Sequence, residues 1–184
     1  MNTRRANSRD RILTAAEQVA RESGPGSLSL DAVAQRAGVS KGGLLYNFPT
    51  KTKLMQGLAA RHVEDFQRDL DEAVAAGEPL IAAYLRLTVY LCDKGENAAW
   101  IFSAVAEDPD VLQPIIDHRR RLLDRLKAES ANSGAALVVF FSMEGLLSMK
   151  LFGTFLLDAN ERDTLLRQLS RMVEDAEPDT GMSS

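Results

Sequence analysis

The residues with the clearest chemical potential lie in one stretch, residues 38–51, which reads "GVSKGGLLYNFPTK". Two adjacent glycines follow a possible helix cap at Ser40, although each costs a helix interior about 1 kcal/mol relative to alanine. The first N–H groups of a helix lack intrahelical partners, lie at the positive end of its dipole and can bind phosphate. Because glycine has no side chain, the backbone can approach such an anion closely. The stretch therefore indicates binding of a phosphate polyanion.

The side chains around the glycine pair offer further contacts to a nucleic acid. Lys41 can read guanine or contact phosphate, and Asn47 can read adenine or contact phosphate. Serine caps can add a hydroxyl or N–H contact. The predicted DNA-binding residues are Ser29, Ser40, Lys41, Gly42, Gly43, Tyr46, Asn47 and Lys51.

The residue groups that catalysis or metal binding needs are missing from the sequence. It has no Ser/His/Asp, Cys/His or paired-carboxylate arrangement, and no Gly-Lys-Ser/Thr follows the glycine pair to form a nucleotide-binding loop. His62, His118 and Cys92 lie too far apart for metal-ligand spacing, and a single cysteine cannot form an intramolecular disulfide. We therefore expect a protein that is not an enzyme and has no metal or cofactor.

Charge is distributed unevenly along the 184 residues, whose net charge is −4. Residues 1–53 contain nine Lys or Arg and four Asp or Glu, which gives +5 and leaves −9 for the rest. A basic head on an acidic body predicts that only the head meets a polyanion. The alternative is an ordinary imbalance of solvated surface. No apolar run of signal-peptide length follows the basic N-terminus, so we expect a cytoplasmic protein.

The elements that must position these residues are all predicted to be helices, because period-2 alternation is nearly absent. The expected helices are 8–22, 29–36, 40–48, 51–76, 79–92, 97–106, 109–130 (bent or restarted near Pro114), 134–158 and 160–175, before a disordered tail from residue 177. The second and third are joined by "RAGVS", which is typical of a helix-turn-helix. The third helix would then lie in the major groove of DNA, while Leu44 and Phe48 face the core.

Residues 29–58, "SLDAVAQRAGVSKGGLLYNFPTKTKLMQGL", resemble the DNA-binding segment of TetR-family transcriptional regulators. The matching positions are Ser29, Val33, Ala34, Ala37, Gly38, Val39, Ser40, Gly42, Leu44, Tyr46, Phe48, Lys51 and Leu54. Leu45 stands where the family often has a tyrosine that contacts the phosphate backbone, and Asn47 stands where histidine or tyrosine is common.

The resemblance implies an all-α protein with a helix-turn-helix DNA-binding domain (1–50), a helical ligand-binding and dimerisation domain (51–176) and a disordered tail (177–184). It also implies a homodimer through the last two helices, a palindromic double-stranded DNA operator and an apolar or amphipathic small-molecule effector. The predicted effector-binding residues are Tyr84, Trp100, Phe102, Phe140, Met143 and Glu144, with Tyr90 and Phe141 as further candidates. Each aromatic residue has an ordinary core role as its alternative.

Glu144 lies in the most apolar segment, where a buried acid needs a partner. Lys150, an arginine or a cationic ligand are the alternatives. Residues 135–157 are long enough to span a bilayer, but the charges inside them are costly there. We therefore expect no membrane span and a helix buried partly against another subunit. The basic run "HRRR" at 118–121 is predicted to be a solvated helix face.

Taken together, these features predict a ligand-responsive transcriptional repressor. The first alternative is a ligand- or protein-binding interaction module with a weakened helix-turn-helix, which Leu45 favours. An all-helical enzyme is the remaining alternative and lacks any catalytic set.

Overall fold

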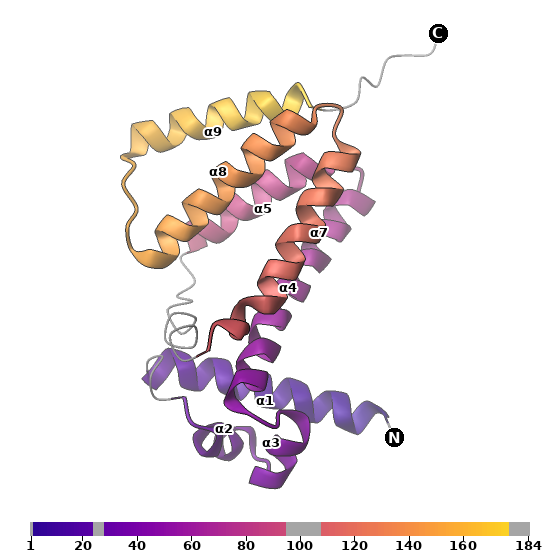
Figure 1. Ribbon diagram of the computed structural model, residues 1–184, viewed down its shortest axis with the longest axis vertical. Coiled ribbons are helices and arrows are strands. Elements are labelled where there is room, and N and C mark those ends of the chain that lie inside the picture. Colours follow the sequence, from indigo (N-terminus) through magenta and orange to yellow (C-terminus); the bar gives the residue numbers. More distant parts are fainter. Residues whose placement is uncertain (1, 24–27, 95–107, 177–184) are drawn as a thin grey trace. The chain divides into compact units, whose positions relative to one another are not determined.

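The computed structural model describes residues 2–23, 28–94 and 108–176, and all regular structure within these ranges is helical (Figure 1). The predicted all-α fold is confirmed. The elements are α1 (Asn2–Ser23), α2 (Leu30–Ala37), α3 (Lys41–Asn47), α4 (Lys51–Ala75), α5 (Leu80–Lys94), the 3-10 turn η2 (Pro109–Leu112), α7 (Gln113–Glu129), α8 (Ser133–Phe152) and α9 (Ala159–Glu174). The helix predicted at 97–106 and the tail from 177 lie outside the described residues.

The chain divides into two compact units. Unit 1 contains the described residues up to Glu64 together with 108–117, and unit 2 contains 65–94 and 118–176. Both α4 and α7 begin in unit 1 and end in unit 2. Each unit has its own apolar core.

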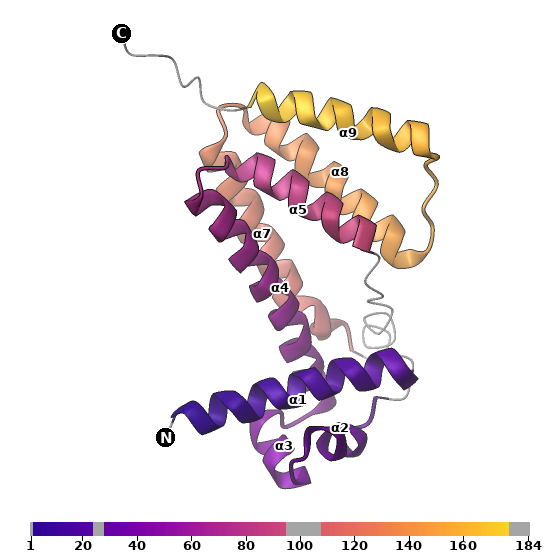
Figure 2. The ribbon, with the colours of Figure 1, turned by 180° about the vertical axis from the view of Figure 1, so that it is seen from behind.

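Unit 1 is built by α1 packing on α2, and α2 on α3, as Figure 2 shows. Its core also receives the first half of α4 and Val111 from η2. Leu44 and Phe48 are buried in this core, as the sequence predicts. The largest fully buried side chains of unit 1 are Ile12, Leu13, Leu44, Leu54, Met55, Leu58 and Val33.

The turn between α2 and α3 is held by backbone geometry and by α1. Gly38 has φ +61° and ends α2, which is the left-handed position that favours glycine. Arg11 donates to the carbonyl of Ala37 at 2.6 Å, so a cation from α1 lies at the negative end of α2. A Cβ on Gly38 would lie 3.1 Å from the Arg11 Nη2.

The junction between α3 and α4 depends on a glycine that the sequence did not single out. A Cβ on Gly57 would lie 2.5 Å from the Phe48 Cε1, closer than side chains approach. Phe48 therefore packs directly against the backbone of α4. This contact anchors the C-terminal end of α3 in the core of unit 1.

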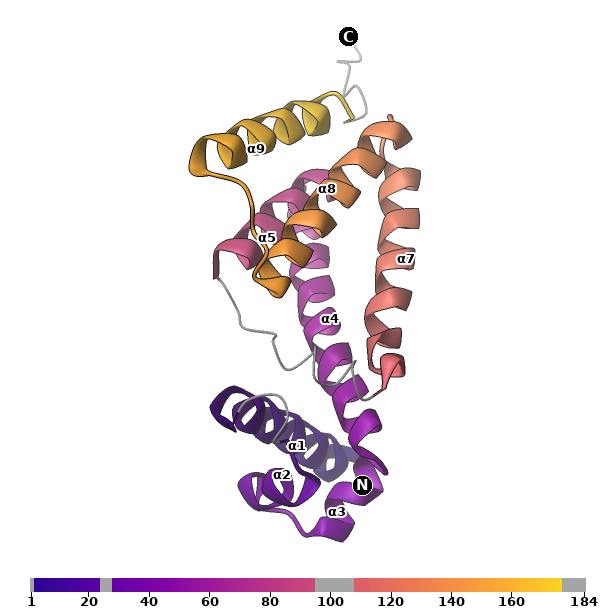
Figure 3. The same cartoon turned by 60° about the vertical axis from the view of Figure 1, so that its left-hand side comes forward.

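In unit 2, α5 packs on both α8 and α9, and α8 packs on α9 (Figure 3). The Arg125 side chain on α7 reaches Asp71 on α4 with N···O 2.6 Å. The largest fully buried side chains of the unit are Tyr84, Leu70, Leu126, Met143 and Leu169.

Two predicted helix boundaries are each wrong by six residues. The first helix begins at Asn2 instead of residue 8. Predicted helix 134–158 ends at Phe152, because Gly153 adopts φ +64° and its N–H bonds the carbonyl of Lys150. The stretch up to Asp158 is non-helical, and Asp158 then caps α9 in a capping box with Glu161.

The predicted bend near Pro114 is a restart. The 3-10 turn η2 runs straight into α7 at Gln113, and Pro114 occupies the second position of the new helix. A proline fits there because the first N–H groups of a helix have no intrahelical acceptor.

Candidate nucleic-acid interface and interior polar cluster

The outer surface of α3 carries the first group of predicted DNA-binding residues. Gly42 and Tyr46 are four residues apart and share one face of the helix. Tyr46 is 69% exposed, and a Cβ added to Gly42 would meet no atom within 4 Å. Nothing within the described residues requires position 42 to be glycine, because its φ is not positive either.

The two glycines differ in what their N–H groups do. Ser40 caps α3, and its Oγ accepts the N–H of Gly43 at 3.1 Å. The first intrahelical bond runs from the N–H of Leu44 to the carbonyl of Ser40. The N–H groups of Lys41 and Gly42 precede it in the first turn and point out of the helix end. Of these two N–H groups, that of Gly42 belongs to a residue without a side chain, so a phosphate oxygen can approach it closely.

Ser29 and Lys41 lie at the N-terminal ends of α2 and α3, respectively. The Ser29 Oγ caps α2 by accepting the N–H of Ala32 at 3.1 Å. The Lys41 Nζ lies 2.9 Å from Oδ1 and 3.0 Å from Oδ2 of Asp31, in the first turn of α2. An ion pair therefore spans the helix-turn-helix on its exposed side.

Three other residues of the stretch are less exposed. Asn47 is half-buried, and its Nδ2 donates to the carbonyl of Gly43 at 2.9 Å, which holds its side chain along α3. Lys51 is half-buried at the first position of α4. Leu45, the departure from the family pattern, packs against the core of unit 1.

Several arginines of the basic head have structural partners. Arg36 on α2 donates both ends of its guanidinium to the Glu22 carboxylate, at 2.9 and 2.6 Å. This contact lowers the pKa of the Glu22 carboxyl, chiefly through the hydrogen bond from Arg36. Arg21 pairs with Glu17 within α1, with an N···O distance of 2.7 Å. The positive charge counted along residues 1–53 is thus partly internal.

The predicted effector residues on α5 and α8 meet inside unit 2. The rings of Tyr84 and Phe140 stack with centroids 5.7 Å apart, and both residues are buried together with Met143. The Tyr84 hydroxyl donates to the carbonyl of Phe140 at a long 3.5 Å. Burial is the main cause that raises the pKa of Tyr84. Trp100 and Phe102 lie outside the described residues.

Glu144 finds its partner on α7. Its Oε2 lies 2.6 Å from the Arg119 Nη2, and 17% of its side chain is exposed. Burial raises the pKa of this carboxyl even though Arg119 opposes the shift. Lys150, the other partner considered from sequence, instead lies over the ring of Phe155, 4.5 Å from its centroid.

The prediction that 118–121 forms a solvated face is wrong at its first residue. His118 is 8% exposed, and its ring lies edge-on to Phe66 on α4 with centroids 6.1 Å apart. Its Nε2 has no hydrogen-bond partner among the residues that the structure describes. Burial, aided by Arg121 and Arg119, lowers the pKa of His118. The sequence holds a signal for the burial of His118, because Leu122 and Leu126 follow it at four-residue steps and so share its face of α7.

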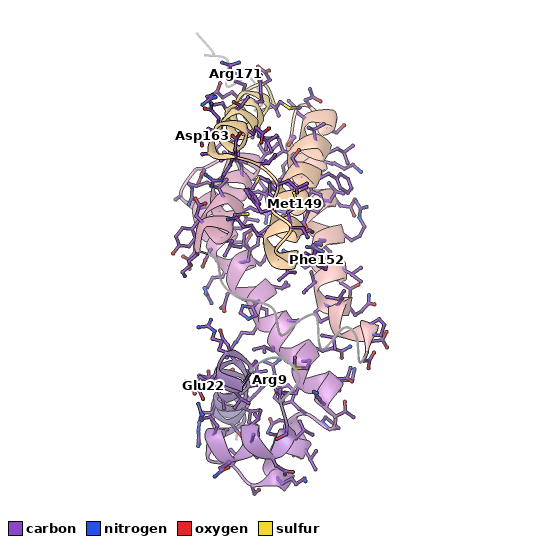
Figure 4. All side chains as sticks on the ribbon, turned by 90° about the vertical axis from the view of Figure 1, so that its left-hand side faces the viewer. Arg9, Glu22, Met149, Phe152, Asp163 and Arg171 are labelled. Atoms are coloured by element: carbon purple, nitrogen blue, oxygen red, sulfur yellow. The ribbon has the colours of Figure 1, made fainter. Side chains whose placement is uncertain are left out.

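One face of α8 remains exposed although it is apolar. Its exposed large residues are Leu137, Val138, Phe141 and Phe152. Figure 4 shows Phe152 and Met149 on the same side of α8. By length and composition, α8 could also cross a membrane, but core helices of soluble proteins meet the same criterion.

An open hollow of about 490 Å³ adjoins this face between α7 and α8. Its lining residues are Arg119, Arg120, Leu123, Phe140, Phe141, Glu144, Gly145 and Ser148. Arg120 is held by Asp124 at 2.9 Å. Tyr90, a further effector candidate from sequence, is 56% exposed on α5 and lies away from the interior.

Comparison with solved structures shows the same fold. The multidrug binding protein EbrR in complex with imidazole has a TM-score of 0.64 and 21% identity, covering 96% of this chain and 98% of its own. A TetR-family transcriptional regulator from Streptomyces coelicolor, SCO4454, gives 0.67 and 18%, with 94% and 97% covered. A transcriptional regulator from Rhodococcus sp. Rha1 gives 0.67 and 22%, with 92% and 98% covered. No curated protein matches the chain.

Two family models match the sequence itself. Residues 12–58 match the bacterial regulatory proteins of the tetR family, which covers the helix-turn-helix. Residues 78–174, more than half of the chain, match the tetracyclin repressor-like C-terminal domain. The chain belongs to the TetR family of transcriptional regulators.

Proposed function

We propose that this regulator is a ligand-responsive repressor that binds a palindromic operator as a homodimer. The observation that carries the DNA-binding part is Gly42. It weakens a short helix, its position has open space for a side chain, and its N–H lies in the turn that can meet phosphate. A glycine at a position where the fold does not require one supports close approach of the DNA backbone. Members of this family are transcription regulators rather than enzymes.

The DNA contacts that we propose are those of α3 and its neighbours. Exposed Tyr46 and the first turn of α3 would face the phosphates, while Lys41 and Asn47 reach bases or phosphates. Lys51 at the start of α4 and the cap Ser29 would clamp phosphates on either side. Leu45 supplies core packing in place of a phosphate contact.

A homodimer through α8 and α9 would cover the exposed apolar face of α8. Phe141, at 62% exposure, and Val138, at 47%, are costly to leave in water. A two-fold interface is self-complementary, so the same face of a second copy can cover it. Two α3 helices related in this way would read the two halves of a palindrome.

The proposed effector site is the interior cluster of unit 2 around Tyr84, Phe140, Met143 and Glu144, with His118 added from the structure. Aromatic rings with a few converging polar groups suit an apolar or amphipathic ligand. EbrR, a multidrug binding protein of the same fold, has been crystallised with ethidium and with malachite green. By analogy, we propose that this regulator binds an aromatic effector. We also propose that it acts in the cytoplasm.

Effector and operator would be coupled through α4, which starts in unit 1 and ends in unit 2. An effector that binds better to a state with the long helix tilted shifts the population away from DNA-competent dimers. The coupling is reciprocal, so operator DNA must weaken effector binding by the same factor.

A gel-shift titration with the DNA upstream of the protein's own gene tests DNA binding. We expect a shift at low salt that weakens as salt rises, because phosphate contacts release counterions. The double substitution Lys41→Ala and Tyr46→Ala should weaken it strongly. An unchanged shift in this variant would favour the alternative function, an interaction module with a weakened helix-turn-helix.

A further inference from the structure

We infer that Asp31 is an internal competitor for DNA: it holds the Lys41 ammonium in the free protein and thereby lowers the affinity and salt sensitivity of DNA binding. The inference rests on the proposed function, in which Lys41 contacts DNA. Its structural basis is the bidentate approach of the Asp31 carboxylate, with Nζ 2.9 Å from Oδ1 and 3.0 Å from Oδ2.

Asp31 lies in the first turn of α2, where its charge favours the helix dipole, but it is not the helix cap. The cap is Ser29, whose Oγ accepts the N–H of Ala32, so the capping hydrogen bond does not depend on Asp31. The carboxylate is 69% exposed and lies outside the core of unit 1. Its side chain pairs with Lys41 on α3, ten residues further along the chain.

Lys41 has an electrostatic reason to accept this partner. It occupies the first position of α3, where the positive end of the helix dipole disfavours a cation. Asp31 offsets that repulsion in the free protein. A phosphate can replace the carboxylate only by breaking the pair, and it then leaves a bare anion beside the polyanionic DNA. Each DNA complex that uses Lys41 therefore carries the cost of displacing Asp31.

The expected gain in DNA affinity is small, because the side chains of Lys41 and Asp31 are both exposed to solvent. Both partners are more than half exposed, at 61% and 69%, and such pairs contribute little in water. We expect Asp31→Asn to raise DNA affinity about two- to fivefold. Because a freed lysine adds up to one effective phosphate contact, the slope of log affinity against log salt should steepen by as much as about 0.9.

The experiment measures binding of Asp31→Asn by fluorescence anisotropy to a labelled mixed-sequence duplex and to the upstream fragment, across a salt series. Glu22→Gln is the matched control, because it removes the same charge from unit 1 and frees Arg36 from an exposed pair. Two further variants complete a double-mutant cycle. One carries Lys41→Met alone, and the other carries Lys41→Met together with Asp31→Asn.

The inference predicts that Asp31→Asn tightens binding to both duplexes more than Glu22→Gln does, and that this difference is smaller in the Lys41→Met background, where only the direct repulsion between Asp31 and DNA is relieved. Equal effects of the two acidic substitutions would overturn it, since net charge alone then explains the gain. A gain that is equally large in the Lys41→Met background, or weaker binding by Asp31→Asn, would also overturn it. A wild-type protein that binds neither duplex would instead refute the proposed function.

Discussion

At the scale of single residues, Gly42 is a position where the fold does not require glycine but the proposed contact with DNA does. A Cβ added at this position of α3 would meet no atom within 4 Å, and the backbone there does not require glycine. Gly42→Ala should raise the free energy of unfolding by up to about 1 kcal/mol, because alanine favours a helix. The same methyl group should lower DNA affinity by blocking the backbone from phosphate.

Thermal unfolding and gel shifts on the same Gly42→Ala preparation check both halves of this prediction. A more stable protein that binds DNA less well cannot be explained by loss of structure. An alanine variant with unchanged affinity would mean that position 42 does not approach the DNA backbone.

His118 predicts a pH dependence of stability. Burial and the charges of Arg119 and Arg121 lower the pKa of this imidazole below its usual 6.5, so it folds as the neutral form. The unfolded chain then binds more protons as pH falls below 6.5, and stability must decline in that window. Above it, the contribution is fully present. The slope from one such group is at most about 1.4 kcal/mol per pH unit.

Urea unfolding of His118→Gln at several pH values between neutral and mildly acidic conditions measures this effect. The variant should show a flatter decline below pH 6.5 than the wild type. Equal slopes in wild type and His118→Gln would contradict the assignment.

At the scale of elements, the junction of α3 and α4 predicts a sharp contrast between two glycines. Gly57→Ala places a methyl group 2.5 Å from the Phe48 ring, so either the ring or α4 must shift. Overpacking of this kind costs about 1–3 kcal/mol. Gly42→Ala is the matched control, because it adds the same methyl group to a helix with open space. Comparison of the two unfolding free energies tests the packing; a stabilised Gly57→Ala would contradict it.

The helix-turn-helix could be predicted from sequence because its determinants are local. Ser29 and Ser40 cap the helices and Gly38 takes the left-handed position, all as the spacing indicates. The end of α8 is also set locally, by the left-handed conformation of Gly153, although the sequence predicts a helix that continues to residue 158. The apolar residues beyond Gly153 do not continue the helix.

Contacts between distant segments could not be predicted. The fit of Phe48 against Gly57 and the pair of Arg119 with Glu144 depend on how helices pack, which no local pattern encodes. His118 is a milder case, because the charged residues that follow it hid the four-residue apolar phase of α7. The eight DNA-binding residues and the effector residues remain predictions, and of the effector residues Trp100 and Phe102 lie outside the part of the chain that the structure describes.

At the scale of the whole molecule, the exposed apolar face of α8 predicts the oligomeric state. Phe141→Glu would place a charge on both sides of a two-fold interface, because the face occurs once in each copy. We expect sedimentation velocity to show a dimer for the wild type and a monomer for this variant. DNA affinity should fall with it, since two linked heads bind far better than one.

Tyr90→Glu is the control for this substitution. Tyr90 is an exposed aromatic residue on α5, outside the two helices of the proposed interface, so the same charge there should leave the dimer intact. A Phe141→Glu protein that sediments as the wild type would exclude this face of α8 from the interface.

Selection from a random duplex library tests the central claim most directly, namely that α3 of a dimeric TetR-family protein reads an operator. The wild-type protein should enrich an inverted repeat whose half-sites are spaced by about one helical turn or a multiple of it. The Lys41→Ala and Tyr46→Ala double variant should enrich no sequence. Failure of the wild type to enrich any sequence at low salt, or enrichment of the same repeat by the double variant, would contradict the account.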